Sequence, residues 1–175
     1  MIPLLILTLI LLAAFVVLLL LPALSGQPWV PANENRIHRA LEMAELRPGE
    51  VLYDLGSGDG RVLIAAARDF GARAVGVELS PLLCALAWIK VLSAGVGKHV
   101  QLQCGSYFNT KPGDADVVYI YLTSGNANRL REKLGGELKH GVRVVSVSAD
   151  LEGWLPAEVD QEALIFLYTI PPNIN

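Results

Sequence analysis

Aliphatic side chains follow one another almost without interruption from Ile2 to Leu21, and the first charged side chain is Glu34. A helix of twenty residues spans roughly 30 Å, which is the thickness of the hydrocarbon core of a bilayer. After residue 33, short apolar runs alternate with stretches of helical periodicity. We therefore predict a transmembrane anchor over residues 1–22, a linker over 23–32 and one folded domain over 33–175.

The domain is predicted to alternate between strands and helices. Asn33 is a good N-cap for a first helix that Pro48 and Gly49 end, and Ser80 and Pro81 begin a later helix. Further helices are expected over 62–70 and 126–138, and strands over 51–55, 74–78, 100–104, 116–122, 142–147 and 163–169. This alternation predicts an α/β fold with a doubly wound, mostly parallel sheet that is covered on both faces.

The N-terminal segment has a second interpretation, as a signal peptide that is removed. Ala23, Leu24 and Ser25 resemble a small-residue cleavage site. However, no Lys or Arg precedes the apolar run, and the run is longer than the roughly 7 to 15 residues of a signal peptide. We favour an uncleaved anchor. Arginines 36, 39 and 47 follow it with no basic side chain on its other side, which predicts that the folded domain lies in the cytoplasm.

Composition narrows the classes of ligand and partner. Apolar residues make up 53% of the 175 positions, which excludes a disordered chain. The net charge is -3 and no run of Lys or Arg occurs, so a nucleic-acid partner is not expected. Cys84 and Cys104 form no metal-binding pair and lie in apolar segments. We expect them to be buried, reduced thiols and expect no bound metal.

The stretch VLYDLGSGDGR, residues 51–61, places three alternating glycines directly after an apolar strand. Glycines allow backbone to turn sharply or to lie against a ligand, and the N–H groups of the following helix point back at that ligand. A dinucleotide fingerprint would need a glycine at the position of Arg61, and a P-loop would need a lysine after the glycines. The loop therefore predicts a nucleotide-like cofactor of another kind.

The pattern D-x-G-x-G-x-G resembles motif I of class I S-adenosylmethionine (SAM) methyltransferases. Glu78 ends the next apolar strand, 24 positions after Asp54, where a carboxylate can accept both ribose hydroxyls of an adenosine. The resemblance implies a class I, Rossmann-like fold whose last strand, 163–169, runs antiparallel. It also implies that the amino-acid part of SAM is held by Asp54, Gly56, Ser57, Gly58 and Gly60, and the ribose by Glu78.

Longer stretches resemble one small family. These are PWVPANENRIHRALEMAELRPGE, VLYDLGSGDGRVLIAAAR, AVGVELSP and GVRVVSVSADLEGWLP. Together with the apolar N-terminus they are similar to membrane-anchored protein lysine methyltransferases, whose characterised eukaryotic members act in mitochondria on the ADP/ATP carrier and the ATP synthase c-subunit. The resemblance implies that residues 31–33 fold over the cofactor, although the family often has Thr or Ser where this chain has Asn33.

Two further positions depart from common class I patterns. Many class I enzymes have an acidic residue after the third strand, where this chain has Ser106; that serine either accepts a weaker hydrogen bond from the adenine amine or belongs to a simple turn. After the fourth strand the chain reads Tyr-Leu-Thr-Ser, not Asn-Pro-Pro-Tyr, which disfavours methylation of DNA adenine or glutamine. Tyr121 and Thr123, on one face with Tyr119, are our candidates for the acceptor channel.

We therefore expect a SAM-dependent methyltransferase that modifies a lysine of a membrane or membrane-associated protein. The protein is expected to be a single-pass membrane protein, with its catalytic domain in the cytoplasm, or in the matrix if it is mitochondrial. Two alternatives stay open at this point. One is a methyltransferase of a lipid or membrane-soluble small molecule, and the other is a non-catalytic SAM-binding membrane protein.

Overall fold

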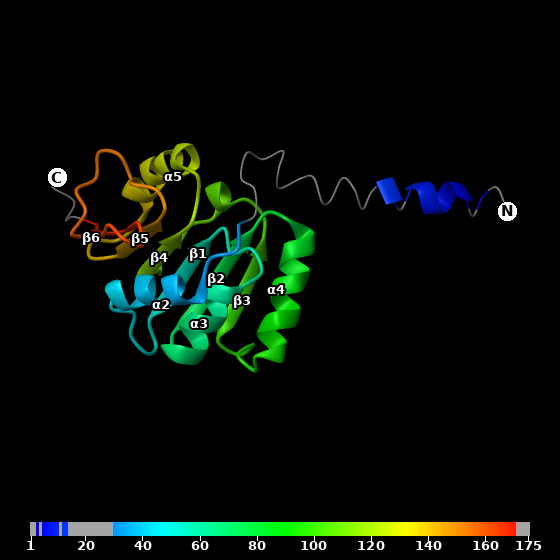
Figure 1. Cartoon of the computed structure of the whole chain (residues 1–175), viewed down its shortest axis with the longest axis horizontal. Helices are drawn as coiled ribbons and strands as arrows, with labels where there is room; N and C mark the ends of the chain where they lie inside the picture. Colours follow the sequence, from blue (N-terminus) through cyan, green and yellow to red (C-terminus); the bar gives the residue numbers. More distant parts are fainter. Residues whose placement is uncertain (1–2, 4, 11, 14–29, 171–175) are drawn as a thin grey trace.

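The computed structural model describes residues 3, 5–10, 12–13 and 30–170 of the chain (Figure 1). Most of the predicted anchor and linker, residues 1–32, lies outside the described residues. Among the residues that are described, no helix combines the length and the hydropathy that a bilayer crossing requires.

A seven-stranded sheet in the order β3-β2-β1-β4-β5-β7-β6 forms the centre of the domain (Figure 1). Its strands are β1 (Val51–Leu55), β2 (Arg73–Glu78), β3 (Val100–Cys104), β4 (Val117–Ile120), β5 (Arg143–Val147), β6 (Glu158–Asp160) and β7 (Ile165–Thr169). Strands β1 to β5 pair in parallel, and β7 pairs antiparallel with β5. The predicted doubly wound, mostly parallel sheet with an antiparallel last strand is confirmed. The short edge strand β6, which pairs with β7, was not predicted.

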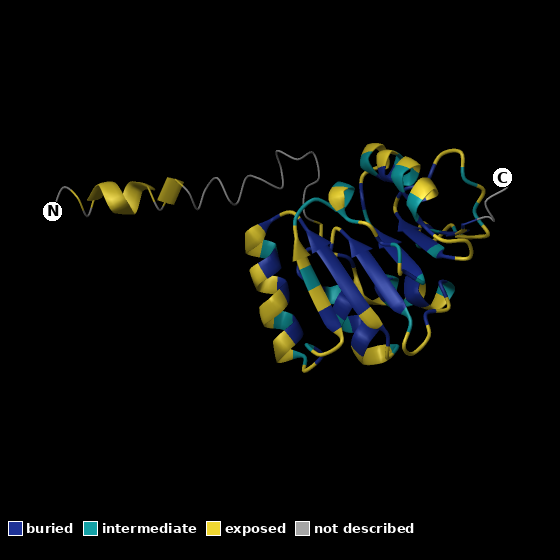
Figure 2. Cartoon of the chain, turned by 180° about the vertical axis from the view of Figure 1, so that it is seen from behind, coloured by how far each residue is buried: buried dark blue, intermediate teal, exposed yellow. Residues whose placement is uncertain are grey.

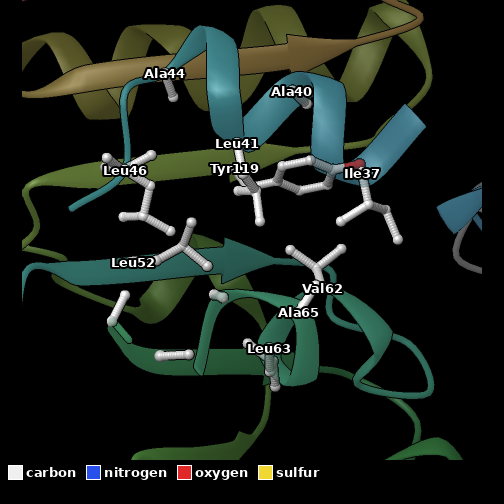
Figure 3. Packing of buried hydrophobic residues seen from close by; sticks show 14 of the residues in the cluster. Ile37, Ala40, Leu41, Ala44, Leu46, Leu52, Val62, Leu63, Ala65 and Tyr119 are labelled. Carbon is white, nitrogen blue, oxygen red and sulfur yellow. The ribbon is translucent and has the colours of Figure 1, made fainter. Parts of the chain in front are cut away.

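Helices cover the two faces of this sheet unequally. The helices α2 (Glu34–Met43), α3 (Arg61–Asp69) and α4 (Pro81–Ser93) lie on one face, and α5 (Ser124–Glu137) lies on the other (Figure 1). Figure 3 shows the packing on the first face, where the Tyr119 ring lies among Ile37, Leu41 and Leu52. The predicted N-caps also hold, because Asn33 accepts from the N–H of Asn35 at 2.9 Å and Ser80 from that of Leu83 at 3.4 Å.

The crossover from β3 to β4 contains no α-helix. Only a 3₁₀ helix, η1 (Tyr107–Asn109), interrupts it, and Pro112 and Gly113 follow soon after. Tyr107 and Phe108 pack against the hydrophobic core between the sheet and α5. These two aromatic side chains cover part of the sheet face that a helix would otherwise cover. The consequence is a short, open connection at the end of the sheet where the glycine loop lies.

The prediction that the two cysteines are reduced is wrong, and of the two only Cys84 is buried as expected. Cys84 and Cys104 are joined by a disulfide, with their Cα atoms 6.1 Å apart, and Cys104 is exposed. Because β2 and β3 pair in parallel, Cys104 lies directly beside Glu78, and α4 begins only three residues after Glu78. Strand pairing therefore brings together two residues that are 20 positions apart in the sequence.

Candidate active site

The glycine loop lies at the carboxyl ends of the central strands, where the chain leaves β1 for α3. Strand order reverses here, since β2 lies on one side of β1 and β4 on the other, and ligands bind at such switch points. Gly60 is the N-cap of α3 with φ +80°, and a Cβ at this position would lie 3.1 Å from Cβ of Ala87 in α4. The close approach of α4 therefore requires glycine at position 60.

Glu78 connects the two halves of the site. One carboxylate oxygen accepts from the backbone N–H of Gly58 at 2.9 Å, and the other accepts from that of Ser80 at 2.8 Å. The side chain is only 8% exposed, and it faces the same cavity as the glycine loop. Each oxygen keeps a second lone pair with which a bound hydroxyl can be held.

Gly76, in the middle of β2, lets the loop pack tightly against the sheet. A Cβ there would lie 2.4 Å from Leu63 and 2.8 Å from the hydroxyl of Ser57. The Ser57 hydroxyl is buried, and within the part of the chain that is described it has no hydrogen-bond partner. The hydroxyl of Tyr119 shares this property, and both residues line the cavity. Buried polar groups are normally paired, so two such groups in one cavity point to a polar ligand.

Three carboxyl groups lie close together at this site, and they differ in their surroundings. Asp54 is 2% exposed; its burial and the nearby charges of Glu78 and Asp59 raise the pKa of its carboxyl well above the ordinary range. Asp59 is also buried, which disfavours its ionisation, but hydrogen bonds from Arg61 and Lys90 outweigh that effect and lower its pKa to about 2. The negative charge of Asp59 is thus balanced by Arg61 and Lys90. A cationic ligand beside Asp54 would favour the ionised form of its carboxyl.

Arg61 holds the segment before α2 over the site. Its guanidinium donates to both carboxylate oxygens of Asp59, at 2.9 and 2.7 Å, and to the backbone oxygen of Ala32 at 2.8 Å. Pro31 and Ala32 therefore line the cavity, as expected of a segment that folds over a cofactor. Asn33 does not line it, because its side chain caps α2.

The cavity has a volume of about 230 Å³ and contains most of the residues that the sequence singled out. Seven of the predicted site residues line it: Asp54, Gly56, Ser57, Gly58, Glu78, Ser106 and Tyr121. Gly60 lies behind the loop against α4, and Thr123 is exposed at the N-cap of α5, outside the cavity wall. Ser106 has the predicted turn role, since its hydroxyl accepts from the N–H of Phe108 at 3.3 Å, and it also faces the cavity.

Several lining residues were not anticipated. Phe108 and Arg129 form a stacked pair on one side of the cavity, with the guanidinium carbon 4.7 Å from the ring centre. Arg36 does not itself line the cavity, but it lies 5.5 Å from the ring centre of the lining residue Tyr121 and donates to the backbone oxygen of Ala163 at 2.7 Å. The Tyr-Phe pair after Ser106 was a sequence signal for an aromatic wall. The arginines had none, because tertiary packing of α2 and α5 places them there.

These residues fit SAM. The carboxyl groups of Asp54 and Glu78 suit a cofactor bearing a sulfonium and an ammonium group, because a cationic ligand beside Asp54 would favour its ionised form. The unpaired hydroxyls of Ser57 and Tyr119 supply polar contacts for such a ligand. The aromatic rings of Tyr107 and Phe108, 4.7 Å apart, offer an apolar surface at the position where the third strand ends. Within the described residues, no cluster of side chains is arranged to hold a metal ion.

Comparison with known proteins also indicates SAM as the cofactor. A family model described as "ANTKMT methyltransferase domain" matches residues 54–158. A protein-lysine N-methyltransferase of Saccharolobus islandicus is 36% identical over 150 residues, which cover 82% of this chain and 93% of the relative. A lysine N-methyltransferase of the ATP synthase c-subunit, from Xenopus laevis, is 30% identical over 142 residues, or 81% of this chain, but the match covers only 62% of that relative.

A solved structure is similar over nearly the whole described domain. It is the crystal structure of an RNA methyltransferase from Salinibacter ruber in complex with S-adenosyl-L-homocysteine, with a TM-score of 0.80 and 40% identity. The match covers 83% of this chain and 97% of that chain. Fold, cavity and relatives agree on one cofactor and one reaction class. The chain belongs to the ANTKMT methyltransferase-domain family and is a class I SAM-dependent methyltransferase with protein-lysine methyltransferases among its homologues.

Proposed function

We propose that the protein methylates the ε-amine of a lysine in a membrane protein, and that residues 1–22 anchor it beside that substrate. The observation that carries the proposal is a cavity in which the acidic cofactor loop meets the aromatic side chains of Tyr119 and Tyr121 at the end of β4. Lysine methyltransferases among the relatives support the acceptor type. One relative is named for a component of ATP synthase, a membrane complex, which supports the location of the substrate.

The cofactor-binding roles follow from the contacts in the loop. Gly56, Ser57 and Gly58 would lie against the amino-acid part of SAM, because their backbone is accessible in the cavity. Asp54 would face its ammonium group, and Glu78 would accept from the ribose hydroxyls. Gly60 would act indirectly, by letting α4 support the loop. When bound, SAM supplies an electrophilic methyl group on a positively charged sulfur.

The acceptor lysine would enter along Tyr121, with Ser106 and Phe108 on the opposite side toward the adenine. The amine must first lose its proton to bulk water, and removal of the amine from water as it enters the site would favour its neutral form. Its nitrogen lone pair then forms the bond to the methyl carbon as the bond from carbon to sulfur breaks, and an aromatic wall stabilises the resulting cation. No histidine lines the described cavity, so the protein's contribution is alignment and exclusion of water.

The anchor and the location are supported by the sequence alone. Residues 1–33 carry no charged side chain, and the aliphatic run has the length of a bilayer crossing. A reducing compartment is no longer indicated by the cysteines, because Cys84 and Cys104 are paired. Placement of the domain in the cytoplasm, or in the matrix if mitochondrial, therefore rests on the supply of SAM and on the arginines after the anchor.

RNA methylation is the second candidate function, because the Salinibacter ruber neighbour is named for it. Charge argues against it. The chain has a net charge of -3, and its cavity contains three carboxyl groups, whereas binding of a phosphate backbone needs clustered Lys and Arg. Of the two arginines that line the cavity, Arg61 is paired with Asp59 and Arg129 is stacked on the ring of Phe108.

A partition experiment separates these functions. The full chain is incubated with methyl-labelled SAM and with membranes and RNA from the cells that carry it, and the label is then separated into protein, lipid and RNA fractions. We expect label in membrane protein, sensitive to protease and resistant to nuclease and to extraction with organic solvent. Label in the lipid or RNA fraction would contradict the proposed lysine acceptor and identify lipid or RNA as the methylated molecule. SAM binding without any transfer would indicate a non-catalytic protein.

A further inference from the structure

One edge of the domain is unusually apolar on its surface. Within residues 30–170, ten large apolar side chains are exposed, and six of them lie in a short stretch of α4 and the residues before it. These six are Leu79, Leu82, Leu86, Trp88, Ile89 and Leu92. Figure 2 shows the exposed surface of α4 along the outer edge of the molecule. Contiguous apolar surface of this kind marks an interaction site.

Five of the six side chains lie on the exposed side of α4, and Leu79 comes just before the helix. Leu82, Leu86 and Ile89 are four and three residues apart, so they lie along one stripe, while Ala87 and Val91 on the opposite side are buried. The helix has one charged side chain, Lys90, which is bound to Asp59 at 2.5 Å. Helix α4 is therefore apolar on both faces, as a helix is when both faces are covered.

The segment that builds this stripe contains basic but no acidic side chains, although Lys90 is paired with Asp59 and Glu34 lines the same pocket as Ile89. From residue 79 to residue 113 the chain contains no Asp or Glu and three lysines, although it has 17 acidic residues in all. This stretch builds α4, β3 and η1, and Lys98 is exposed in the turn directly after α4. An apolar stripe in a basic, acid-free segment complements the surface of a bilayer that contains anionic lipids.

The same edge is where the chain arrives from its N-terminal segment. Val30 is 56% exposed, and it lines the same cavity as Leu79 and Leu83, which lie just before and within the first turn of α4. If residues 1–22 enter a bilayer, the eight linker residues 23–30 keep this end of α4 close to the membrane surface.

We propose that the outer face of α4 rests on an anionic lipid bilayer and so fixes the orientation of the methyltransferase domain. The proposal depends on the proposed membrane anchor and goes beyond it, because an anchor alone leaves the domain free to rotate on its linker. Docking of α4 holds the mouth of the cavity beside the membrane surface. The acceptor is then restricted to lysines at the membrane interface.

The test uses the tryptophans of the full chain reconstituted in vesicles. The chain has three tryptophans, and the double substitution Trp29→Phe/Trp154→Phe leaves Trp88 as the reporter on α4. The matched protein Trp29→Phe/Trp88→Phe leaves Trp154, whose ring packs 5.9 Å from that of Tyr168 on the other side of the sheet. Emission is measured with phosphatidylcholine brominated near the headgroup, with and without phosphatidylserine, and flotation shows whether the chain is in the vesicles.

We expect quenching of most of the Trp88 emission, stronger quenching with phosphatidylserine, and little quenching of Trp154. Ile89→Glu/Leu92→Glu should abolish the Trp88 quenching, whereas Leu155→Glu/Val159→Glu, at exposed apolar positions elsewhere, should not. Unquenched Trp88 in a chain that floats would overturn the docking and leave the anchor standing. Trp88 emission that is blue-shifted but unquenched would overturn it too, by showing that a second copy covers α4. A chain that does not float would overturn both proposals.

Discussion

Glu78 at the end of β2 accepts a hydrogen bond from the backbone N–H of Gly58, in the loop after β1, at 2.9 Å. The carboxylate proposed to bind the ribose therefore also fixes the loop proposed to hold the rest of the cofactor. The second oxygen fixes the start of α4 through Ser80. One side chain thus links three elements of the site.

Removal of this carboxylate should weaken SAM binding more than loss of a ribose contact alone would. Glu78→Ala is expected to reduce affinity by about 1.5–3 kcal/mol, the range for hydrogen bonds to charged groups, and to loosen the glycine loop. Glu78→Gln keeps one acceptor and should lose less. Calorimetric titration with SAM measures both, and Glu162→Ala, at an acid with 87% of its side chain exposed, is the matched control. Equal affinity in all four proteins would refute the assignment.

The buried carboxyl of Asp54 should cost stability in the free protein. Its raised pKa means that the folded state holds this proton more tightly than the unfolded state, so stability falls as pH rises from about 4 through that raised pKa. Asp54→Asn is expected to be more stable than wild type at neutral pH and equally stable near pH 4. It should nevertheless bind SAM more weakly. Urea unfolding at the two pH values measures the difference, and a destabilised variant at neutral pH would contradict the interpretation.

Arg61 should stabilise the protein through Asp59 and position the segment above the cofactor through Ala32. Arg61→Met leaves Asp59 with Lys90 alone and is expected to cost about 1–3 kcal/mol in the free energy of unfolding, measured by urea denaturation. Because the pKa of Asp59 is lowered to about 2, the contribution is present above the ordinary aspartate pKa and lost as pH falls toward about 2. The two proteins should converge there.

Arg61→Lys separates the two roles. A lysine keeps the positive charge beside Asp59 but lacks the planar fork that reaches both Asp59 and the Ala32 oxygen. We expect it to recover part of the stability but not the SAM affinity. Full recovery of both would show that only the charge matters and that residues 30–32 need no tether.

Much of the fold follows from local patterns in the sequence. Strands β1 and β3 are bounded by turn residues and carry short apolar runs, so their limits were predicted correctly. Helices α2 and α4 follow Asn33 and Ser80, whose side chains cap the first turn as predicted. Strand β6 escaped notice because it has three residues with no buried side chain, and only its pairing with β7 defines it.

The site residues also fall into two groups, those that a local motif predicts and those that only the tertiary fold brings together. Asp54 and the glycines lie in one contiguous motif, and Glu78 ends the next strand. Their positions in the sequence were therefore enough to predict their roles. The disulfide between Cys84 and Cys104 depends on the register of β2 with β3, and the Phe108–Arg129 stack depends on the packing of α5. Arg61 shows the limit most clearly. Its identity argued against a dinucleotide, but only the fold shows that it binds Asp59 and Ala32.

Tyr121 and Thr123 were predicted together as the acceptor channel, and the structure separates them. Tyr121 lines the cavity under Arg36, whereas Thr123 is exposed beyond the wall. Tyr121→Ala is expected to lower kcat about 10–100-fold with little change in SAM affinity, because the acceptor loses its alignment. Tyr121→Phe keeps the ring and should retain most of the rate. Thr123→Ala should behave as wild type in both measurements, and a large loss of rate there would return Thr123 to the channel.

The central claim is transfer of a methyl group from SAM to a lysine side chain. Its most direct test is tandem mass spectrometry of membrane proteins after incubation with the full chain and SAM that carries a deuterated methyl group, with the Glu78→Ala protein as a parallel sample. We predict deuterated methyl on the ε-amine of a lysine near the membrane interface, strongly reduced with the variant. Deuterated methyl confined to other side chains, lipids or RNA, or equal labelling by both proteins, would contradict this claim.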